Sequence, residues 1–426
     1  MDSDTGESLP AALLPYCGRS LLEGLMRDLQ AREFLHFKIF GKQCITPVAV
    51  MTSSVKNNHE HIVAICERLE WFGRGRESFR LFEQPLVPVV NAEDGKWLIS
   101  ESLLPVGKPG GHGAIWKLAC DRGVFEWLYR HGRKGATVRQ VSNVVAATDL
   151  TLMALAGIGL RHNKKLGFAS CERRPGATEG VNVLIEKQNF DGLWEYGITC
   201  IEYTEFEKYG ISEPTATNGS LQASYPANTN ILYVDLQAAQ EVGSRKNASC
   251  LPGIVLNLKK AVSYVDHLGF ECSAAGGRLE CTMQNIADNF MNTYSYRCSE
   301  GIESELDTFI VYNERKKVTS SAKRKLKPED RSLHQTPEGS LLDIMRNAHD
   351  LLSSCSIEVP KFIGGSISKG SELQIEVAEF LWEDVELDGS LIILADNIMG
   401  STKRNTQGEQ ILHYGARYRL LQAHVI

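Results

Sequence analysis

The feature that most constrains this sequence is a short apolar strand pattern that ends in a polar tip and runs into a helix pattern. Residues 45–51 read ITPVAVM, a β-branched run typical of a strand covered on both faces. The polar triplet Thr52-Ser53-Ser54 follows, and helical spacing extends from about His61 to Leu69. Strand, polar tip and helix in this order form the βα unit of a doubly wound sheet. The pattern therefore favours an α/β fold.

Further segments alternate between helix and strand patterns, which supports the same class. Apolar residues recur at helical spacing from Leu21 to Phe40, and a shorter helix is expected from Leu150 to Ala156. The other strand candidates are residues 86–90, 138–145, 166–171, 181–186, 198–203 and 230–235. Of these, residues 166–171 and 181–186 are expected to form a strand pair.

Composition and charge exclude several functional classes. The 426 residues carry a net charge of −6, whereas nucleic-acid binding needs a basic footprint. No run approaches the roughly 18 apolar residues that a membrane span requires. The 11 cysteines are odd in number and form no CxxC pair, so neither a zinc site nor a disulfide framework is expected. We expect reduced, mostly buried thiols.

The pattern changes toward the C-terminus. A basic stretch lies between Glu314 and Arg331, helical spacing returns at residues 341–345, and short alternating strands follow Gly364-Gly365. We expect a main α/β domain over residues 1–330, a helical linker over 331–363 and a β-rich appendage over 364–426. The appendage pattern fits rungs of a β-solenoid, although a single hairpin would show the same alternation.

A glycine-rich segment, KPGGHGAIW at residues 108–116, places three glycines around one histidine. Glycine permits positive φ and lets a ligand approach main-chain N–H groups, while histidine adds a hydrogen-bonding ring near neutral pH. This combination is typical of a turn that holds a nucleotide. An ordinary surface turn explains the same letters, so both interpretations stay open on this stretch alone.

Polar residues at predicted strand ends are further candidates. Asp149 follows an apolar strand pattern and could hold a divalent cation or a ribose hydroxyl, or it could cap the next helix. Asn228 and Asn230 could bind sugar hydroxyls or form a turn. Lys259 follows the strand pattern of residues 254–258 and could neutralise a phosphate or be solvated.

Six segments together resemble the UDP-sugar pyrophosphorylase superfamily, in family order over about residues 13–320. They read LQAREFLHFKIFGKQCITPVAVMTSSVKNNHEHI, FEQPLVPVV, KPGGHGAIW, SNVVAATD, PANTNILYVDL and RLECTMQNIAD. The phrases RHGRKGATVRQVSNVVAATD and GGRLECTMQNIADNF are similar to the branch of plant plastidial UDP-glucose pyrophosphorylases. The resemblance implies a Rossmann-like, GT-A-like nucleotidyltransferase with a mixed sheet and helices on both faces.

The same resemblance implies roles for individual residues. Gly111 and His112 would hold the uridine, Gln84 would contact the uracil edge, and Asp149 would lie at the metal and the nucleotide. The residues expected at the hexose are Glu179, Gly180, Asn228 and Asn230.

Two lysines match phosphate-binding positions of the family. Lys259 falls where the family writes NPK, with Leu258 in place of the proline. Lys317, before VTSS, is the nearest match to a second phosphate lysine, and Lys316 competes because the alignment is loose there.

The implied reaction joins UTP and glucose 1-phosphate into UDP-glucose and pyrophosphate. The attacking phosphate oxygen is already an anion, so no general base is needed. Positioning and cationic neutralisation by Mg²⁺ and lysines can supply the acceleration. The resemblance further implies a chloroplast stromal protein that supplies sulfolipid synthesis, although residues 1–10 show no transit-peptide pattern.

One departure from the family is a missing phosphate loop. The family opens with a Gly-rich LxGGxGTxxG loop and a lysine, and no such segment occurs in these 426 residues. We therefore expect a truncated or alternatively spliced product with strongly impaired turnover and partly retained uridine binding. A non-catalytic UDP-sugar-binding or regulatory remnant is the alternative function, and an interaction scaffold using the β-rich appendage is a third.

Overall fold

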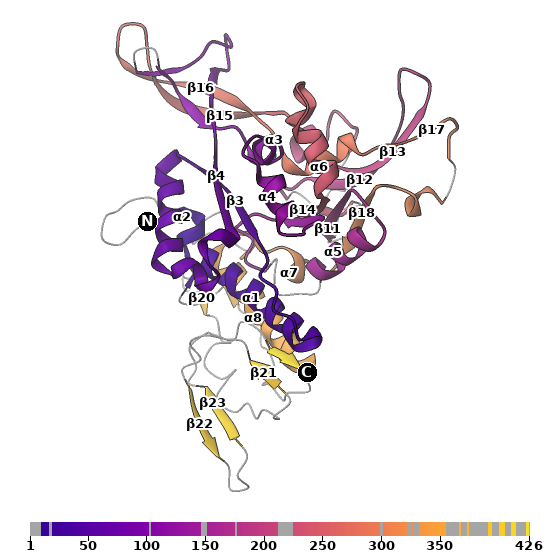
Figure 1. The fold of residues 1–426 in the computed structure, drawn as a ribbon. Helices are drawn as coiled ribbons and strands as arrows, with labels where there is room; N and C mark the ends of the chain where they lie inside the picture. The colour runs from indigo at the N-terminus through magenta and orange to yellow at the C-terminus, as the bar shows by residue number, and fades with distance from the viewer. Residues whose placement is uncertain are drawn as a thin grey trace. The chain divides into compact units, whose positions relative to one another are not determined.

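The computed structural model describes residues 10–16, 19–101, 104–145, 151–174, 177–211, 225–298, 301–322, 326–327 and 332–354, with short strands beyond residue 365 (Figure 1). Contacts divide the chain into two units. Unit 1 comprises Pro47–Val138 and Met153–Tyr312, together with Met1–Pro10. Unit 2 comprises Ala11–Thr46, Arg139–Leu152 and Asn313–Ile426. The domain boundaries expected from the sequence stay a prediction.

The βα unit predicted for residues 45–69 is present in unit 1. Strand β3 (Val48–Ser53) leads through α2 (Asn58–Arg68) to β4 (Phe79–Gln84), and the two strands pair in parallel side by side (Figure 1). The polar tip makes a contact within this unit: the backbone N–H of Ser53 donates to Oδ1 of Asn58, the first residue of α2, at 3.1 Å. The expected strand, tip and helix are therefore confirmed, with the strand three residues later than predicted at its start.

The main sheet of unit 1 is mixed. Its strands follow the order β17 (Asn292–Tyr294), β13 (Trp194–Ile201), β12 (Val181–Gln188), β14 (Ala227–Asp235), β11 (Leu166–Cys171) and β18 (Thr308–Tyr312), and β10 (Gly135–Val138) also pairs with β14. Only β11 and β18 are parallel within it. The expected strands 166–171 and 181–186 exist, but β14 lies between them, so the prediction that they pair was wrong.

Helices cover both faces of this sheet, as the resemblance implied. Side chains from α3 (Ile115–Asp121), α4 (Val124–Arg130) and α6 (Leu236–Gly243) share one buried core with Leu232 and Val234 of β14. The side chain of Tyr233, between them, points to the opposite face because strand side chains alternate. There Tyr233 packs so closely on Gly159 of α5 (Thr151–Arg161) that a Cβ at Gly159 would lie too near its ring.

A second sheet of unit 1 carries the hairpin of β15 (Val255–Val265) and β16 (Glu271–Glu280). Its order is β6 (Val90–Asn91), β16, β15, β7 (Ile99–Glu101) and β8 (Leu104–Pro105). Nearby, β5 (Leu86–Pro88) pairs with β9 (Gly107–Pro109) in an antiparallel ladder that leads into the glycine-rich turn. The β5–β9 pair therefore holds residues 107–109, which directly precede the glycine-rich turn.

Unit 2 contains the long helices α1 (Leu21–Phe40) and α8 (Pro337–Ser354), the short helix α7 (Arg315–Val318) and the strand pair β1 (Pro15–Tyr16) and β2 (Arg19–Ser20). Helix α1 has the bounds expected from the sequence, because Ser20 Oγ accepts from the N–H of Glu23 and Gly41 ends it at φ +65°. The strand expected over residues 138–145 was wrong, since β10 ends at Val138. Residues 139–145 instead pack as turns with Leu21 and Ile344.

The C-terminal part is described only as short antiparallel pairs. These are β19 (Ser366–Ile367) with β20 (Leu373–Gln374), β21 (Leu391–Ile393) with β24 (Ala423–Val425), and β22 (Gly400–Arg404) with β23 (Gln410–Tyr414). Residues 364–426 therefore contain short strands where the structure describes them, and the β-solenoid-like appendage stays a prediction.

The described cysteines fit the expectation of reduced thiols. No disulfide joins these nine residues, and Cys66, Cys171, Cys200, Cys250 and Cys281 are buried. Burial raises the pKa of Cys66 and of Cys281 to about 11, which keeps both protonated at neutral pH. No described helix has an apolar stretch long enough to cross a membrane.

Candidate functional site

The glycine-rich turn of unit 1 is held against the chain's own backbone. Gly111 has φ +94°, and a Cβ there would lie 2.4 Å from the carbonyl oxygen of Cys281. Gly113 donates its N–H to that oxygen at 2.8 Å, and the N–H of Cys281 donates to the Gly110 carbonyl at 3.0 Å. Glycine is therefore required at Gly111 by packing and by backbone conformation, independently of any ligand.

The ring of His112 is oriented by the same partner segment. The backbone N–H of Met283 donates to His112 Nδ1 at 3.0 Å, and Trp116 Nε1 donates to the Met283 carbonyl at 2.9 Å. Because Nδ1 accepts, the neutral ring carries its proton on Nε2. His112 is thus held in one tautomer and one orientation by the main chain.

Gln84 ends strand β4, two residues before β5 begins. Strands β5 and β9 pair Leu86 with Pro109, and a Cβ at Gly110 would lie 4.0 Å from the carbonyl oxygen of Pro85, the residue after Gln84. The side-chain oxygen Oε1 of Gln84 is buried and accepts no hydrogen bond from the described residues. A buried acceptor without a donor is unusual, because desolvation costs free energy that a hydrogen bond normally offsets.

The helical turn η9 (Met283–Asn289) connects the glycine-rich turn to the end of β13. Asn285 Nδ2 donates to the Cys200 carbonyl at 2.9 Å, and Gln284 Nε2 donates to Glu202 Oε1. Farther along, Thr199 Oγ1 donates to Asp288, whose carboxyl pKa is raised by burial. Sequence reasoning quoted this segment only as a family motif and assigned no residue of η9 to the site.

The expected hexose residues meet at the end of β13. A Cβ at Gly180 would lie 2.7 Å from Cys200 Sγ and 3.3 Å from Glu202 Oε1, so only glycine fits there. The N–H of Asn228 donates to the Gly180 carbonyl at 2.9 Å, and Asn228 Nδ2 donates to Asn230 Oδ1 at 3.0 Å. Asn228 and Asn230 begin β14, which runs antiparallel to β11, so they lie beside the carboxyl end of β11.

Glu179 is held by an arginine that sequence reasoning missed. Arg173, only 2% exposed, donates from Nε to the Glu179 carbonyl at 3.1 Å and from Nη2 to the Ala177 carbonyl at 2.5 Å. Its guanidinium also lies 5.0 Å from the ring centre of Phe206. No spacing pattern in ERRPGATEG distinguishes Arg173 from the exposed Arg174 beside it, and burial alone separates the two.

Lys259 lies inside a strand, which differs from the expectation that it follows one. Strand β15 continues to Val265, and Lys259 pairs with Gly276 just before a shift in register. Its side chain is exposed, and no described residue forms a hydrogen bond or ion pair with it. No described contact joins Lys259 to the glycine-rich turn or to Asn228.

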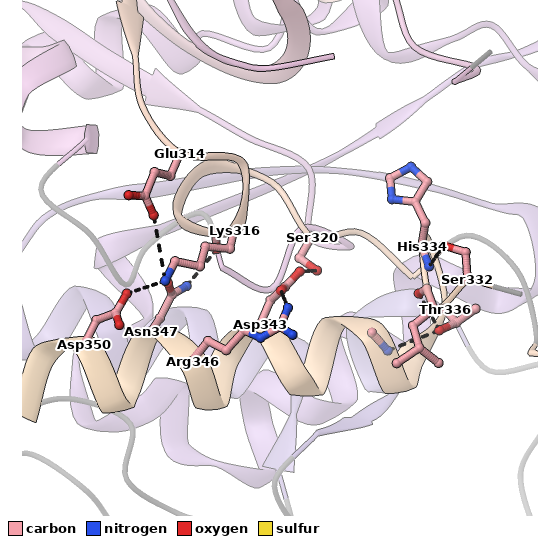
Figure 2. A network of polar contacts seen from close by, with 12 residues as sticks. Glu314, Lys316, Ser320, Ser332, His334, Thr336, Asp343, Arg346, Asn347 and Asp350 are labelled. Atoms are coloured by element: carbon pink, nitrogen blue, oxygen red, sulfur yellow. Dashed lines mark hydrogen bonds and ion pairs between the residues drawn. The ribbon is translucent and has the colours of Figure 1, made fainter. Parts of the chain in front are cut away.

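In unit 2, the two competing lysines have different surroundings. Lys316 Nζ forms an ion pair with Asp350 of α8 at 2.5 Å and a longer one with Glu314 at 3.7 Å, as Figure 2 shows. Lys317 is half-buried, and within the described part of the chain its ammonium group has no ion-pair partner. Of the two, only Lys316 has a carboxylate partner among the described residues.

Asp149 lies outside the described residues, so its position relative to the others stays a prediction. The described residues contain no group of three or more His, Cys, Asp or Glu side chains that could hold a metal ion. Of the predicted nucleotide and hexose residues in unit 1, the structure connects Gly111 and His112 to Gly180, Asn228 and Asn230 through η9 and Glu202.

Comparison with known proteins adds a family match. Residues 26–275 match the family described as UTP–glucose-1-phosphate uridylyltransferase, and residues 362–424 match a family described as UGP3-like, C-terminal hexapeptide repeats. The sequence is 62% identical over 449 residues to the chloroplastic UTP–glucose-1-phosphate uridylyltransferase 3 of Arabidopsis thaliana, covering 98% of this chain and 51% of the relative. The chain thus spans about half the length of that relative.

Solved structures share the fold at low sequence identity. A UDP-N-acetylglucosamine pyrophosphorylase from Trypanosoma brucei, in complex with an inhibitor, has a TM-score of 0.59 and 16% identity, covering 82% of this chain and 68% of that chain. A UDP-glucose pyrophosphorylase variant from Leishmania major, in complex with UDP-glucose, has a TM-score of 0.51 and 17% identity, covering 73% and 59%. These likenesses establish the fold.

Proposed function

This chain belongs to the UTP–glucose-1-phosphate uridylyltransferase family, and we propose that it forms UDP-glucose and pyrophosphate from UTP and glucose 1-phosphate. The observation that carries the proposal is the contact path from Gly111 and His112 through η9 to Gly180 and Asn228. Contacts of η9 thereby link the residues proposed for uridine to those proposed for the hexose. A UDP-sugar, which has a base at one end and a sugar at the other, matches such a site.

The uracil end of the proposed site uses hydrogen bonds from fixed groups. Gln84 has the buried, unsatisfied Oε1 that can accept a hydrogen bond from the uracil N3–H. The backbone at Gly111 and the oriented ring of His112 are the other groups proposed to hold the uridine. At the hexose end, Glu179, Gly180, Asn228 and Asn230 offer carboxylate, carbonyl and amide groups suited to sugar hydroxyls.

The reaction itself needs positioning and charge neutralisation. An oxygen of glucose 1-phosphate forms a bond to the α-phosphorus of UTP, and the bond from that phosphorus to the pyrophosphate oxygen breaks. Lys259 and Lys317 are proposed to neutralise the phosphates, since neither has an ion-pair partner among the described residues. Mg²⁺, when bound, would further neutralise the phosphates. Asp149 is its proposed protein ligand, an oxygen donor of the kind Mg²⁺ prefers.

The test separates binding from turnover. Calorimetry with UDP-glucose should show binding that Gln84→Leu weakens, because the variant removes the acceptor proposed for the uracil edge. Steady-state release of pyrophosphate from UTP and glucose 1-phosphate, with Mg²⁺, measures the reaction. Absence of UDP-glucose binding in the unmodified chain would overturn the proposal.

Binding without turnover would instead favour the alternative of a UDP-sugar-binding or regulatory protein. A plastid stromal location and a role in sulfolipid synthesis are also proposed, the first supported by the chloroplastic Arabidopsis relative. For residues 362–424, the hexapeptide-repeat match supports a proposed solenoid-like appendage.

A further inference from the structure

The first residues of strand β14 are held by buried polar side chains of the two neighbouring strands. Strand β14 lies between β12 and β11 (Figure 1). Asn182 of β12 donates from Nδ2 to Ser170 Oγ of β11 at 2.8 Å, and Ser170 Oγ donates to the Ala227 carbonyl of β14 at 2.6 Å. Asn182 is 2% exposed, and Ser170 and Ala227 are fully buried. The two side chains therefore join β12, β11 and the backbone of β14 away from water.

The peptide group between Ala227 and Asn228 is fixed at both of its ends. Its carbonyl oxygen accepts from Ser170 Oγ, and its N–H, which belongs to Asn228, donates to the Gly180 carbonyl at 2.9 Å. Asn228 is 7% exposed, and its Nδ2 donates to Asn230 Oδ1 at 3.0 Å. Because a peptide group is planar, fixing both ends restricts the direction of the next Cα–Cβ bond. The orientation of the Asn228 side chain therefore depends on the hydrogen bonds of this peptide.

The fold alone does not explain an asparagine at position 182. Its oxygen Oδ1 is buried and accepts no hydrogen bond from the described residues. A buried acceptor without a donor lowers stability, whereas an apolar side chain at the same position has no such cost. Backbone pairing does not need the amide either, because the N–H of Asn182 donates to the Pro226 carbonyl at 3.0 Å and Ser170 pairs with Asn228 in the β11–β14 ladder.

We propose that Asn182 is a positioning residue for the hexose, which acts through Ser170 and the peptide before Asn228. The inference rests on the proposed function, since that function assigns Asn228 to the hydroxyls of the hexose. Asn182 itself touches no substrate, because its amide is buried against Ser170. A hydrogen bond weakens when donor and acceptor are misaligned, so the loss of Asn182 reduces the hexose part of the affinity and leaves the uridine part unchanged.

The experiment compares UDP-glucose with UDP, which lacks the hexose, by calorimetry on the 426-residue chain. Asn182→Val removes the amide and keeps a side chain suited to a strand. The affinity for UDP-glucose is expected to fall about fivefold, the size of one neutral hydrogen bond, while the affinity for UDP stays within about twofold. Equal losses for both ligands, or no loss for either, would overturn the proposal.

A double-mutant cycle tests the route through Ser170. Ser170→Ala deletes the hydroxyl between Asn182 and the Ala227 carbonyl and should weaken UDP-glucose binding by a similar factor. Adding Asn182→Val to Ser170→Ala should weaken it by less than about twofold further, because the two side chains act in one chain of hydrogen bonds. Ser170→Ala also serves as the single variant if Asn182→Val does not fold. Additive effects of the two changes would overturn the proposal.

A matched control separates positioning from loss of stability. Thr308 of β18 is fully buried in the same sheet, and its Oγ1 accepts from the N–H of Ile198 at 2.6 Å. Thr308 pairs with Leu166, at the other end of β11 from Ser170. Thr308→Val is expected to lower the melting temperature without changing the ratio of the UDP-glucose and UDP affinities. A ratio that Thr308→Val lowers as strongly as Asn182→Val would overturn the positioning role.

The outcomes separate this inference from the proposed function. If the unmodified chain does not bind UDP-glucose, the proposed function is wrong and the role of Asn182 in it falls as well. If the chain binds UDP-glucose and Asn182→Val leaves the ratio of the two affinities unchanged, the proposed function stands and only the positioning role is wrong.

Discussion

The glycine-rich turn of unit 1 and the Lys317 segment of unit 2 (residues 313–321) are both candidate binding segments, but different interactions hold them. The turn is fixed by main-chain hydrogen bonds of Gly110 and Gly113 with Cys281, with glycine where a Cβ would not fit. The Lys317 segment is fixed by amide and carboxylate side chains of Asn143, Asp343 and Asn347. A backbone contact restricts the residue type at the contact itself. A side-chain contact instead restricts the residue types at the distant positions that supply the side chains.

The largest expected effect tests the backbone contact. Gly111→Ala should destabilise unit 1 by about 2–5 kcal/mol, because it combines a positive φ with a close approach to Cys281. Urea unfolding monitored by tryptophan fluorescence measures the change. UDP-glucose binding should be lost in the folded fraction.

A matched glycine separates conformation from packing. Gly132 has φ +71°, but a Cβ at this position would have no atom within 4 Å, so Gly132→Ala should cost only about 1–2 kcal/mol. If the two variants lose equal stability, close packing at Gly111 contributes nothing, and backbone contact does not distinguish the turn from the Lys317 segment.

The sequence could predict the elements that depend on local pattern. Helix α1 has the expected bounds because a serine cap and a terminal glycine bracket its apolar spacing. The turn at Gly111 was predictable because its steric requirement for glycine is visible in the local sequence, GGHG at residues 110–113. Residues 139–145 were mistaken for a strand, since VRQVSNVV has strand-like composition, whereas Asn143 bonds to residues 175 and 177 positions away.

Long-range contacts also explain why parts of the candidate site were missed. Arg173 and Gln284 are polar residues that belong to no recognisable sequence pattern, and only their burial in the structure distinguishes them from surface residues. The pairing of β12 with β13, and the insertion of β14 beside β11, depend on tertiary packing that periodicity does not encode. The different surroundings of Lys316 and Lys317 depend on Asp350, which is 34 residues from Lys316 in sequence.

A second prediction uses a buried charge in unit 2. Asp28 of α1 is 5% exposed, and burial raises its pKa from 3.8 to about 6 despite the nearby cations Arg139 and Arg32. The folded state therefore binds a proton more tightly than the unfolded state. Below about pH 4 both states are protonated, and stability falls as pH rises toward 6, by about 3 kcal/mol for this group.

Asp28→Asn should remove this pH dependence. The difference in free energy of unfolding between variant and unmodified chain is expected to shift by about 2–3 kcal/mol in favour of the variant between pH 4 and pH 7. Urea midpoints at the two pH values measure it, and other titrating groups cancel in the difference. A constant difference would show that Asp28 is ionised at ordinary pKa, so that α1 does not bury a costly charge beside Arg139.

The smallest expected change in stability separates the two lysines. Lys316→Met removes a partly exposed ion pair, whose side chains are 30% and 38% accessible, and should cost at most about 1 kcal/mol. UTP affinity should stay within about twofold, because Asn143 and Asn347 still hold the backbone.

Lys317→Met should leave stability equally unchanged but weaken UTP binding about tenfold, since it deletes a cation proposed to face phosphate. Calorimetry and thermal unfolding of both variants check this contrast. If Lys316→Met weakens UTP binding as much as Lys317→Met, then Lys316 leaves Asp350 to bind phosphate, and side-chain contacts in unit 2 do not determine which cation is available.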